Sequence, residues 1–217
     1  MLNLIKKEFA LCLHPTAFIF LSFALLCFVP NYPYEVVFFF SGLSVFFYSM
    51  NARETGDLIF TAGLPVNKSD VPKAKILTVA LFQVVLTVLV GLIGEIKCLI
   101  IPGDVINQAG ISANLSLVGN GALILSLFNL TYFSMYFKNP DKIGISFLIA
   151  SALVFLLITV FIVLRHTTVL YGELLNGLNS ENTLLKLGYM LICLCVYAVA
   201  TICSIKISVN EFAKIDL

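Results

Sequence analysis

Charged residues are scarce in this chain, making up 12% of its 217 residues, whereas 60% are hydrophobic. The mean hydropathy is +1.03. A soluble domain needs polar side chains to cover its surface, so this composition excludes one and predicts an integral membrane protein. The net charge of +1 supplies no basic field, which excludes a nucleic-acid-binding protein.

The chain also lacks a phosphate-binding loop of the pattern Gly-x-x-x-x-Gly-Lys-Ser/Thr, so it cannot hydrolyse ATP by that route. Metal chemistry is not indicated either. The six cysteines fall mostly in apolar runs, where a thiol behaves as a small hydrophobic group. Cys193-Leu194-Cys195 has no histidine or carboxylate nearby to complete a metal site, and we expect neither a disulfide framework nor a bound metal.

Charge is missing from the interiors of the apolar runs as well. Four ionisable residues are predicted near their outer ends, where side chains reach headgroups or water: Glu35, Glu95, Lys97 and Lys186. An ion-coupled transporter needs an acid or base within the membrane, and an intramembrane hydrolase needs converging catalytic groups. The absence of both favours a protein driven by an external motor.

Six apolar runs are long enough to cross about 30 Å of hydrocarbon as helices. They are predicted at 15–29, 34–50, 76–96, 115–137, 143–164 and 184–205. The first two are short, so they must recruit flanking residues or lie in a thinned bilayer. The first is expected to stay as an anchor, because no small-x-small cleavage site follows it. We therefore predict a single all-α transmembrane domain over 1–217.

The basic residues predict the orientation of these spans. With a cytoplasmic N-terminus, ten of the 13 basic residues lie in inner segments and three in outer segments. The inner ones are Lys6, Lys7, Arg53, Lys68, Lys73, Lys75, Lys138, Lys142, Lys206 and Lys214; the outer ones are Lys97, Arg165 and Lys186. Both termini and the polar loop 51–75 are thus predicted to be cytoplasmic.

The first 14 residues have the pattern of an amphipathic helix on the inner membrane surface. One face is apolar, through Leu2, Ile5, Phe9 and Leu13. A cytosolic extension of the first span is the alternative. At the other side of the membrane, two longer segments are predicted, 97–114 and 165–183, the second with a short interfacial helix.

The loop 51–75 is the most informative segment, because it combines charges with apolar side chains between two long apolar runs. Residues 52–63 are predicted to form about three helical turns. Gly63 is suited to a left-handed helix end, and Pro65 prevents continuation. Ser69 or Asp70 can then cap the next helix. We interpret the loop as a docking surface; the alternative is that it packs only against the bundle's inner ends.

The loop resembles the first cytoplasmic loop of ABC-2 type permeases, the membrane subunits of bacterial ABC exporters. The resemblance lies in Asp57-x-x-Phe60-x-x-x-Leu64-Pro65-Val66-x-Lys68-x-Asp70, followed by Lys73 and Lys75. The opening Leu4-Ile5-Lys6-Lys7-Glu8-Phe9 is also similar to the N-terminal segment of that family. This resemblance to the family implies a type V exporter-like fold, with an N-terminal interfacial helix, six spans, and a coupling helix between the first two spans and the third.

The resemblance also implies partners. Two permease chains, identical or different, would pair, and each would dock a cytosolic ATPase that carries the ATP and Mg. The residues implied in docking are Asp57, Leu58, Phe60, Leu64, Pro65 and Val66, with Glu54, Asp57 and Lys68 as rim contacts. No cofactor is expected in this chain.

Uncharged polar residues within the predicted spans could line a substrate path, with Gln83, Asn120 and Asn129 as candidates. Ordinary hydrogen bonding between helices is the alternative for each of them. We predict a permease in the bacterial cytoplasmic membrane that exports a hydrophobic or amphipathic substrate, such as a peptide toxin, antimicrobial peptide, drug or lipid. The alternatives are a non-transporting membrane anchor for a cytosolic partner and an ion-coupled secondary transporter.

Overall fold

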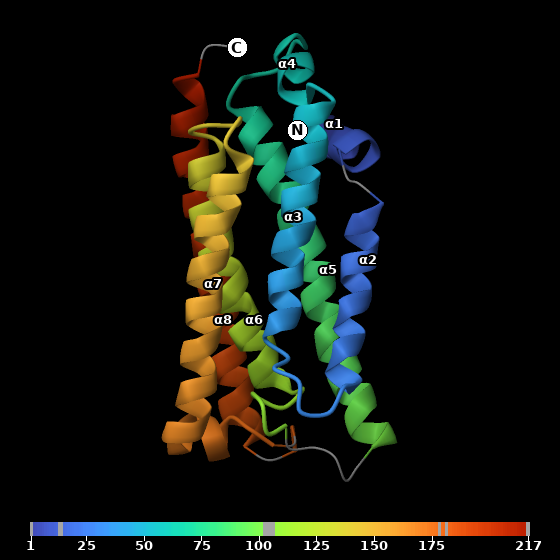
Figure 1. Ribbon diagram of the computed structural model, residues 1–217, viewed down its shortest axis with the longest axis vertical. Helices are drawn as coiled ribbons and strands as arrows, with labels where there is room; N and C mark the ends of the chain where they lie inside the picture. Colours follow the sequence, from blue (N-terminus) through green and yellow to red (C-terminus); the bar gives the residue numbers. More distant parts are fainter. Residues whose placement is uncertain (1, 13–14, 102–106, 178, 181, 216–217) are drawn as a thin grey trace.

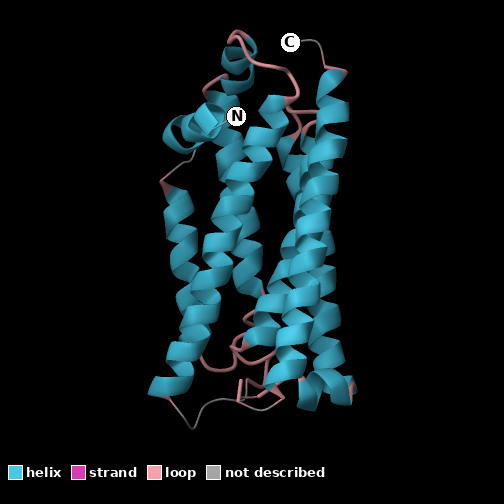
Figure 2. Ribbon diagram, turned by 180° about the vertical axis from the view of Figure 1, so that it is seen from behind, coloured by secondary structure: helices cyan, strands magenta, loops and turns pink. Residues whose placement is uncertain are grey.

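The chain forms an upright bundle of helices (Figures 1 and 2). The computed structural model describes residues 2–12, 15–101, 107–177, 179–180 and 182–215, and none of these lies in a β-strand. The helices are α1 (Leu2–Lys7), the π-helix η1 (Glu8–Cys12), α2 (Thr16–Ser22), the 3₁₀-helix η2 (Phe23–Phe28), α3 (Val36–Glu54), α4 (Asp57–Ala62), α5 (Asp70–Ile100), α6 (Leu115–Tyr136), α7 (Ile143–Thr167), the π-helix η3 (Leu170–Leu174) and α8 (Thr183–Ala213). The predicted all-helical fold is confirmed.

The two ends of the bundle differ in what they carry. Helices α1 and α4 and the last turn of α8 lie together at one end, which we call the inner end (Figure 1). At the opposite end, called the outer end, α5 and α7 finish and α6 and α8 begin. Helix α1 and the C-terminal turn of α8 therefore lie at the same end of the bundle, as an even number of crossings requires.

Five of the six predicted spans are helices long and apolar enough to cross a membrane: α3, α5, α6, α7 and α8. The first predicted span is shorter, consisting of α2 and η2. A 3₁₀-helix rises by about 2.0 Å per residue rather than 1.5 Å, so the two together reach only about 22 Å. Helices Leu2–Leu11 and Thr16–Phe28 meet at 88°, which places α1 and η1 across the bundle axis.

Helix α6 forms the centre of the bundle and contacts α3, α5, α7 and α8. Within the 18-residue apolar stretch of α6, 72% is buried in the bundle, whereas in the corresponding stretch of α8 only 17% is buried. Gly119 and Gly121 let the neighbours of α6 approach closely. A Cβ at Gly119 would lie 2.8 Å from the Tyr189 ring, and one at Gly121 only 2.1 Å from the Phe38 ring.

The outer end corrects one expectation. Three of the four ionisable residues predicted to reach headgroups or water are instead buried, namely Glu35, Lys97 and Lys186, with 0%, 6% and 0% exposure. Lys97 Nζ donates to Tyr34 Oη at 2.6 Å, and the Ile111 amide donates to Glu35 at 3.2 Å. These polar contacts come from the turn before α3, through Tyr34, and from the outer segment after α5, through Ile111. The short helix predicted in 165–183 is the π-helix η3.

Candidate functional site

Four charged side chains meet at the inner end of the bundle: Lys7 of α1, Glu8 of η1, Asp57 of α4 and Lys75 of α5. Lys75 Nζ lies 2.5 Å from Asp57 Oδ2 and 3.0 Å from Glu8 Oε2. Lys7 Nζ lies 2.5 Å from Asp57 Oδ1 and 2.8 Å from Glu8 Oε1. All four side chains are at most 11% exposed. Buried charges are tolerated when paired, and here two cations balance two carboxylates. We call these four residues the ion cluster.

Hydrogen bonds extend the ion cluster to a further helix. The Tyr48 hydroxyl of α3 donates to Glu8 Oε2. Thr61 of α4 accepts from Lys7 Nζ at 2.9 Å and donates to the Asp57 carbonyl at 2.7 Å. Burial alone would raise the pKa of Glu8, but the Lys75 ammonium and hydrogen bonds from Lys7 and Tyr48 outweigh it and lower the pKa below 4.5.

The backbone of Gly56 sets the direction of α4. Its φ is 65°, in the left-handed region that glycine adopts without strain, and it separates α3 from α4. The predicted continuous helix over 52–63 is therefore wrong, because a left-handed residue interrupts it. Gly63, predicted to be left-handed, has a φ of −76°. As a result, α4 is a separate helix of six residues at the tip of the inner end (Figure 1).

Helix α4 has two faces of opposite character. Residues four apart share a face of a helix, and Asp57 and Thr61 both point inward to the ion cluster. Ile59 and Phe60 point outward, with 73% and 56% exposure. Ile59 and Phe60 therefore form an exposed apolar face on a short helix beyond the spans.

Two cavities lie at the inner end near α4. One cavity of about 430 Å³ lies between α1 and the loop after α4, lined by Leu64, Pro65, Val66 and other residues. A second, of about 240 Å³, lies between α4 and the turn that joins α6 to α7, lined by Ile59, Pro140 and others. The second cavity is lined by residues of α4 itself, whereas the first lies beside the loop that follows α4.

The structure separates the predicted docking residues into two groups. Glu54, Phe60, Leu64, Pro65 and Val66 lie at the inner surface, exposed or half-buried. The other three make contacts within the chain: Asp57 is in the ion cluster, Leu58 packs against the core, and the exposed Lys68 donates from Nζ to the Ala213 carbonyl at 3.2 Å. Since lysine favours a helix C-terminus, Lys68 completes the end of α8. The expected rim position of Asp57 is corrected accordingly, whereas Lys68 is exposed and its role as a rim contact stays a prediction.

The predicted path residues Gln83 and Asn129 form a closed pair between α5 and α6. Their side-chain amides exchange hydrogen bonds of 2.8 and 2.7 Å, and Tyr197 of α8 donates to Gln83 Oε1 at 2.8 Å. Asn120 accepts from Tyr189 at 2.7 Å. Gln83, Asn120 and Asn129 are all 0% exposed. They join helices within the bundle, and a role in a substrate path stays a prediction.

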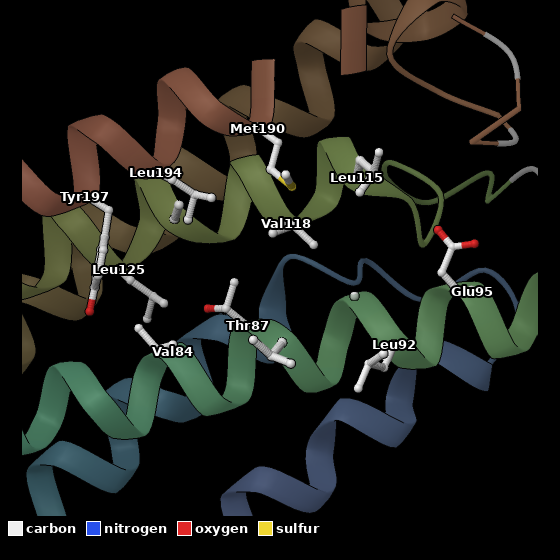
Figure 3. Close-up of a pocket in the computed structure, with 13 residues that line it drawn as sticks. Val84, Thr87, Leu92, Glu95, Leu115, Val118, Leu125, Met190, Leu194 and Tyr197 are labelled. Atoms are coloured by element: carbon white, nitrogen blue, oxygen red, sulfur yellow. The ribbon is translucent and has the colours of Figure 1, made fainter. Parts of the chain in front are cut away.

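An apolar groove lies beside this pair, between α5, α6 and α8 (Figure 3). Its volume is about 430 Å³. Tyr197 and Leu125 line one end, and Glu95 lies at the other, towards the outer end of the bundle. None of the three predicted path residues is among the described residues that line it.

Several residues of the site were not predicted from the sequence. Lys7, Glu8, Tyr48, Thr61 and Lys75 were not assigned a role, and Ile59 was not placed among the docking residues although it is more exposed than Phe60. The available signal was weak: acidic and basic residues at the borders of the first and third apolar runs, with no local spacing to show that they meet.

The fold and the site define a class: a multi-pass helical membrane protein that holds a short, apolar-tipped helix on an ion cluster at one end. Comparison with known proteins is consistent with this class. Residues 3–210 match the model of the family described as ABC-2 family transporter protein. The chain therefore belongs to the ABC-2 transporter family and is a transmembrane component, not itself an ATPase. No curated protein and no solved structure matches the chain.

Proposed function

We propose that the chain is the permease subunit of an ABC exporter and docks a separate cytosolic ATPase through α4. The observation that carries the proposal is the exposure of Ile59 and Phe60 on a helix whose opposite face is fixed by the ion cluster. Apolar side chains at the centre of an interface contribute most of its binding energy, and the flanking cavities supply room for a partner's side chains.

The ion cluster supplies the mechanical link in this proposal. Asp57 joins α4 to Lys7 of α1 and to Lys75 of α5, and Glu8 joins the same two lysines to Tyr48 of α3. A displacement of α4 by the ATPase is thus delivered to three helices at once, of which α3 and α5 cross the membrane. In the proposed cycle, ATP and Mg bound by the ATPase drive that displacement, and the spans reorient.

The remaining parts of the proposal concern surroundings and cargo. The bundle works in the bacterial cytoplasmic membrane, with its inner end and both termini in the cytoplasm and paired with a second permease chain. Its substrate is hydrophobic or amphipathic, with peptides, drugs and lipids as the candidate classes. The support is the apolar character of the groove and of the lipid-facing helices.

The test replaces the exposed apolar residues of α4 and measures whether the partner still co-purifies. A tagged chain with Ile59→Asp and Phe60→Asp is purified in mild detergent, and co-purifying proteins are identified by mass spectrometry. We expect the unaltered chain to retain a protein bearing a phosphate-binding loop and the variant to lose it, while both stay folded. The matched control is Val169→Asp, which is 63% exposed at the outer end and should retain the partner.

Two outcomes would overturn the proposal. A partner without a phosphate-binding loop would identify the chain as a membrane anchor. A phosphate-loop protein that binds equally well to the α4 variant would show that docking occurs elsewhere.

A further inference from the structure

The groove between α5, α6 and α8 carries a single charge, located at its outer mouth (Figure 3). Glu95 is the one charged residue among the described residues that line it. This carboxylate is exposed, and its Oε1 accepts a hydrogen bond from the side-chain amide of Asn179. A neutral amide orients Glu95 without cancelling its charge, so a negative charge is held at the entrance of an apolar groove.

The length of the groove along α5 is close to the hydrocarbon thickness of one bilayer leaflet. Along α5, its lining extends from Val84 to Glu95, which at 1.5 Å per residue is about 16 Å. Half of the hydrocarbon thickness is about 15 Å. Its inner end is closed by Tyr197, which hydrogen-bonds to Gln83 at 2.8 Å. An occupant of the groove would therefore have its apolar part in the outer leaflet and its polar part at Glu95.

The walls leave space for an extended chain. Val88 and Leu92 are 55% and 54% exposed and open the groove to the bilayer. Gly91 contributes no side chain between them, and a Cβ there would already contact Val118 at 3.5 Å. The volume of about 430 Å³ lies within the range of small-molecule sites.

We propose that this groove is a binding site for a cationic amphiphile with one alkyl chain, whose ammonium group pairs with Glu95. An uncharged amphiphile of the same length gains only the apolar contacts, and an anionic one is repelled by the carboxylate. The charge at the mouth is what selects the occupant over ordinary lipid. This inference rests on the proposed function and deepens it by naming the class of amphiphile that the groove binds, although binding here requires neither an ATPase nor α4.

The chain contains no tryptophan, which gives a clean optical test. Leu92→Trp places one fluorophore in the groove of the full chain, reconstituted in phosphatidylcholine bilayers. The probes are bromododecyltrimethylammonium and uncharged bromododecanol, whose bromine quenches tryptophan. We expect half-quenching at an about tenfold lower membrane concentration of the cation, equivalent to about 1.4 kcal/mol. Adding Glu95→Gln, which preserves shape, should abolish the difference between the two probes.

The second part of the experiment fills the groove with a larger side chain. Gly91→Leu should weaken quenching by both probes, whereas Gly144→Leu, where a Cβ meets nothing within 4 Å, should leave it unchanged. Equal quenching by both probes, unaffected by Glu95→Gln, would mean that bilayer lipid simply fills the groove and would overturn the inference. Absence of quenching by either would show that protein, such as a second copy, covers it, with the same consequence. Neither result bears on docking at α4, which the purification experiment tests separately.

Discussion

Removing Lys75 should destabilise the bundle far more than removing a neighbouring lysine. Lys75→Met leaves Glu8 and Asp57 buried, with one cation, Lys7, to serve both. Breaking a buried ion pair on one side costs roughly 3–5 kcal/mol, and because Lys7 still lies 2.8 Å or less from each carboxylate, we expect about 3 kcal/mol. The matched control is Lys73→Met on the same helix: that lysine is 37% exposed and pairs with Asp70, so its loss should cost about 0.5 kcal/mol or less.

The assay is equilibrium denaturation in mixed micelles, followed by far-ultraviolet circular dichroism, with a double-mutant cycle. Asp57→Asn in the Lys75→Met background removes the excess negative charge, so the double variant should be more stable than the sum of the single effects by about 2 kcal/mol. Additive effects, or equal losses for Lys75→Met and Lys73→Met, would refute the view that the four charges act as one buried unit.

Two further predictions concern pH and packing. Because the pKa of Glu8 is lowered below 4.5, its contribution to stability should be complete above pH 4.5 and disappear as the pH falls through the lower folded value, with Glu8→Gln flattening the profile. A loss of unfolding free energy that begins near neutral pH would contradict this. Gly121→Ala should cost about 1–3 kcal/mol, because its Cβ would lie 2.1 Å from the buried Phe38 ring. Gly144→Ala, in open space, should cost nothing measurable in the same denaturation, and equal losses would show that the ring moves aside freely.

The spans could be predicted from sequence because a run of apolar residues in lipid must satisfy its backbone as a helix. The run 115–137 therefore corresponds closely to α6, and 143–164 to most of α7. The helix ends were less predictable where a span continues beyond the membrane. Helix α8 extends to Ala213, well past the apolar run, because polar residues near a helix end carry no hydropathy signal.

The ion cluster could not be predicted, for a different reason. Lys7 and Asp57 are 50 residues apart, and Lys75 and Asp57 are 18 apart, so no local periodicity relates them. Their meeting depends on the crossing of α1 over the inner end, which is a tertiary feature. The helix break at Gly56 was not predicted either. The sequence favoured Gly63 as the left-handed residue, but the left-handed residue is Gly56, directly before Asp57 of the ion cluster.

The contacts beneath α4 are ion pairs rather than apolar contacts. This difference affects how a displacement of α4 would pass to the other helices. Apolar side chains would hold α4 at least as firmly, since buried ion pairs gain little over well-packed hydrophobic groups. They would also permit sliding, because apolar contact has no preferred direction. Two carboxylates and two ammonium groups, each within 3.0 Å of its opposite charges, instead join α4 to α1 and α5 through directed contacts. If the proposed ATPase docks on α4, these ion pairs predict that a displacement of α4 passes to α1 and α5.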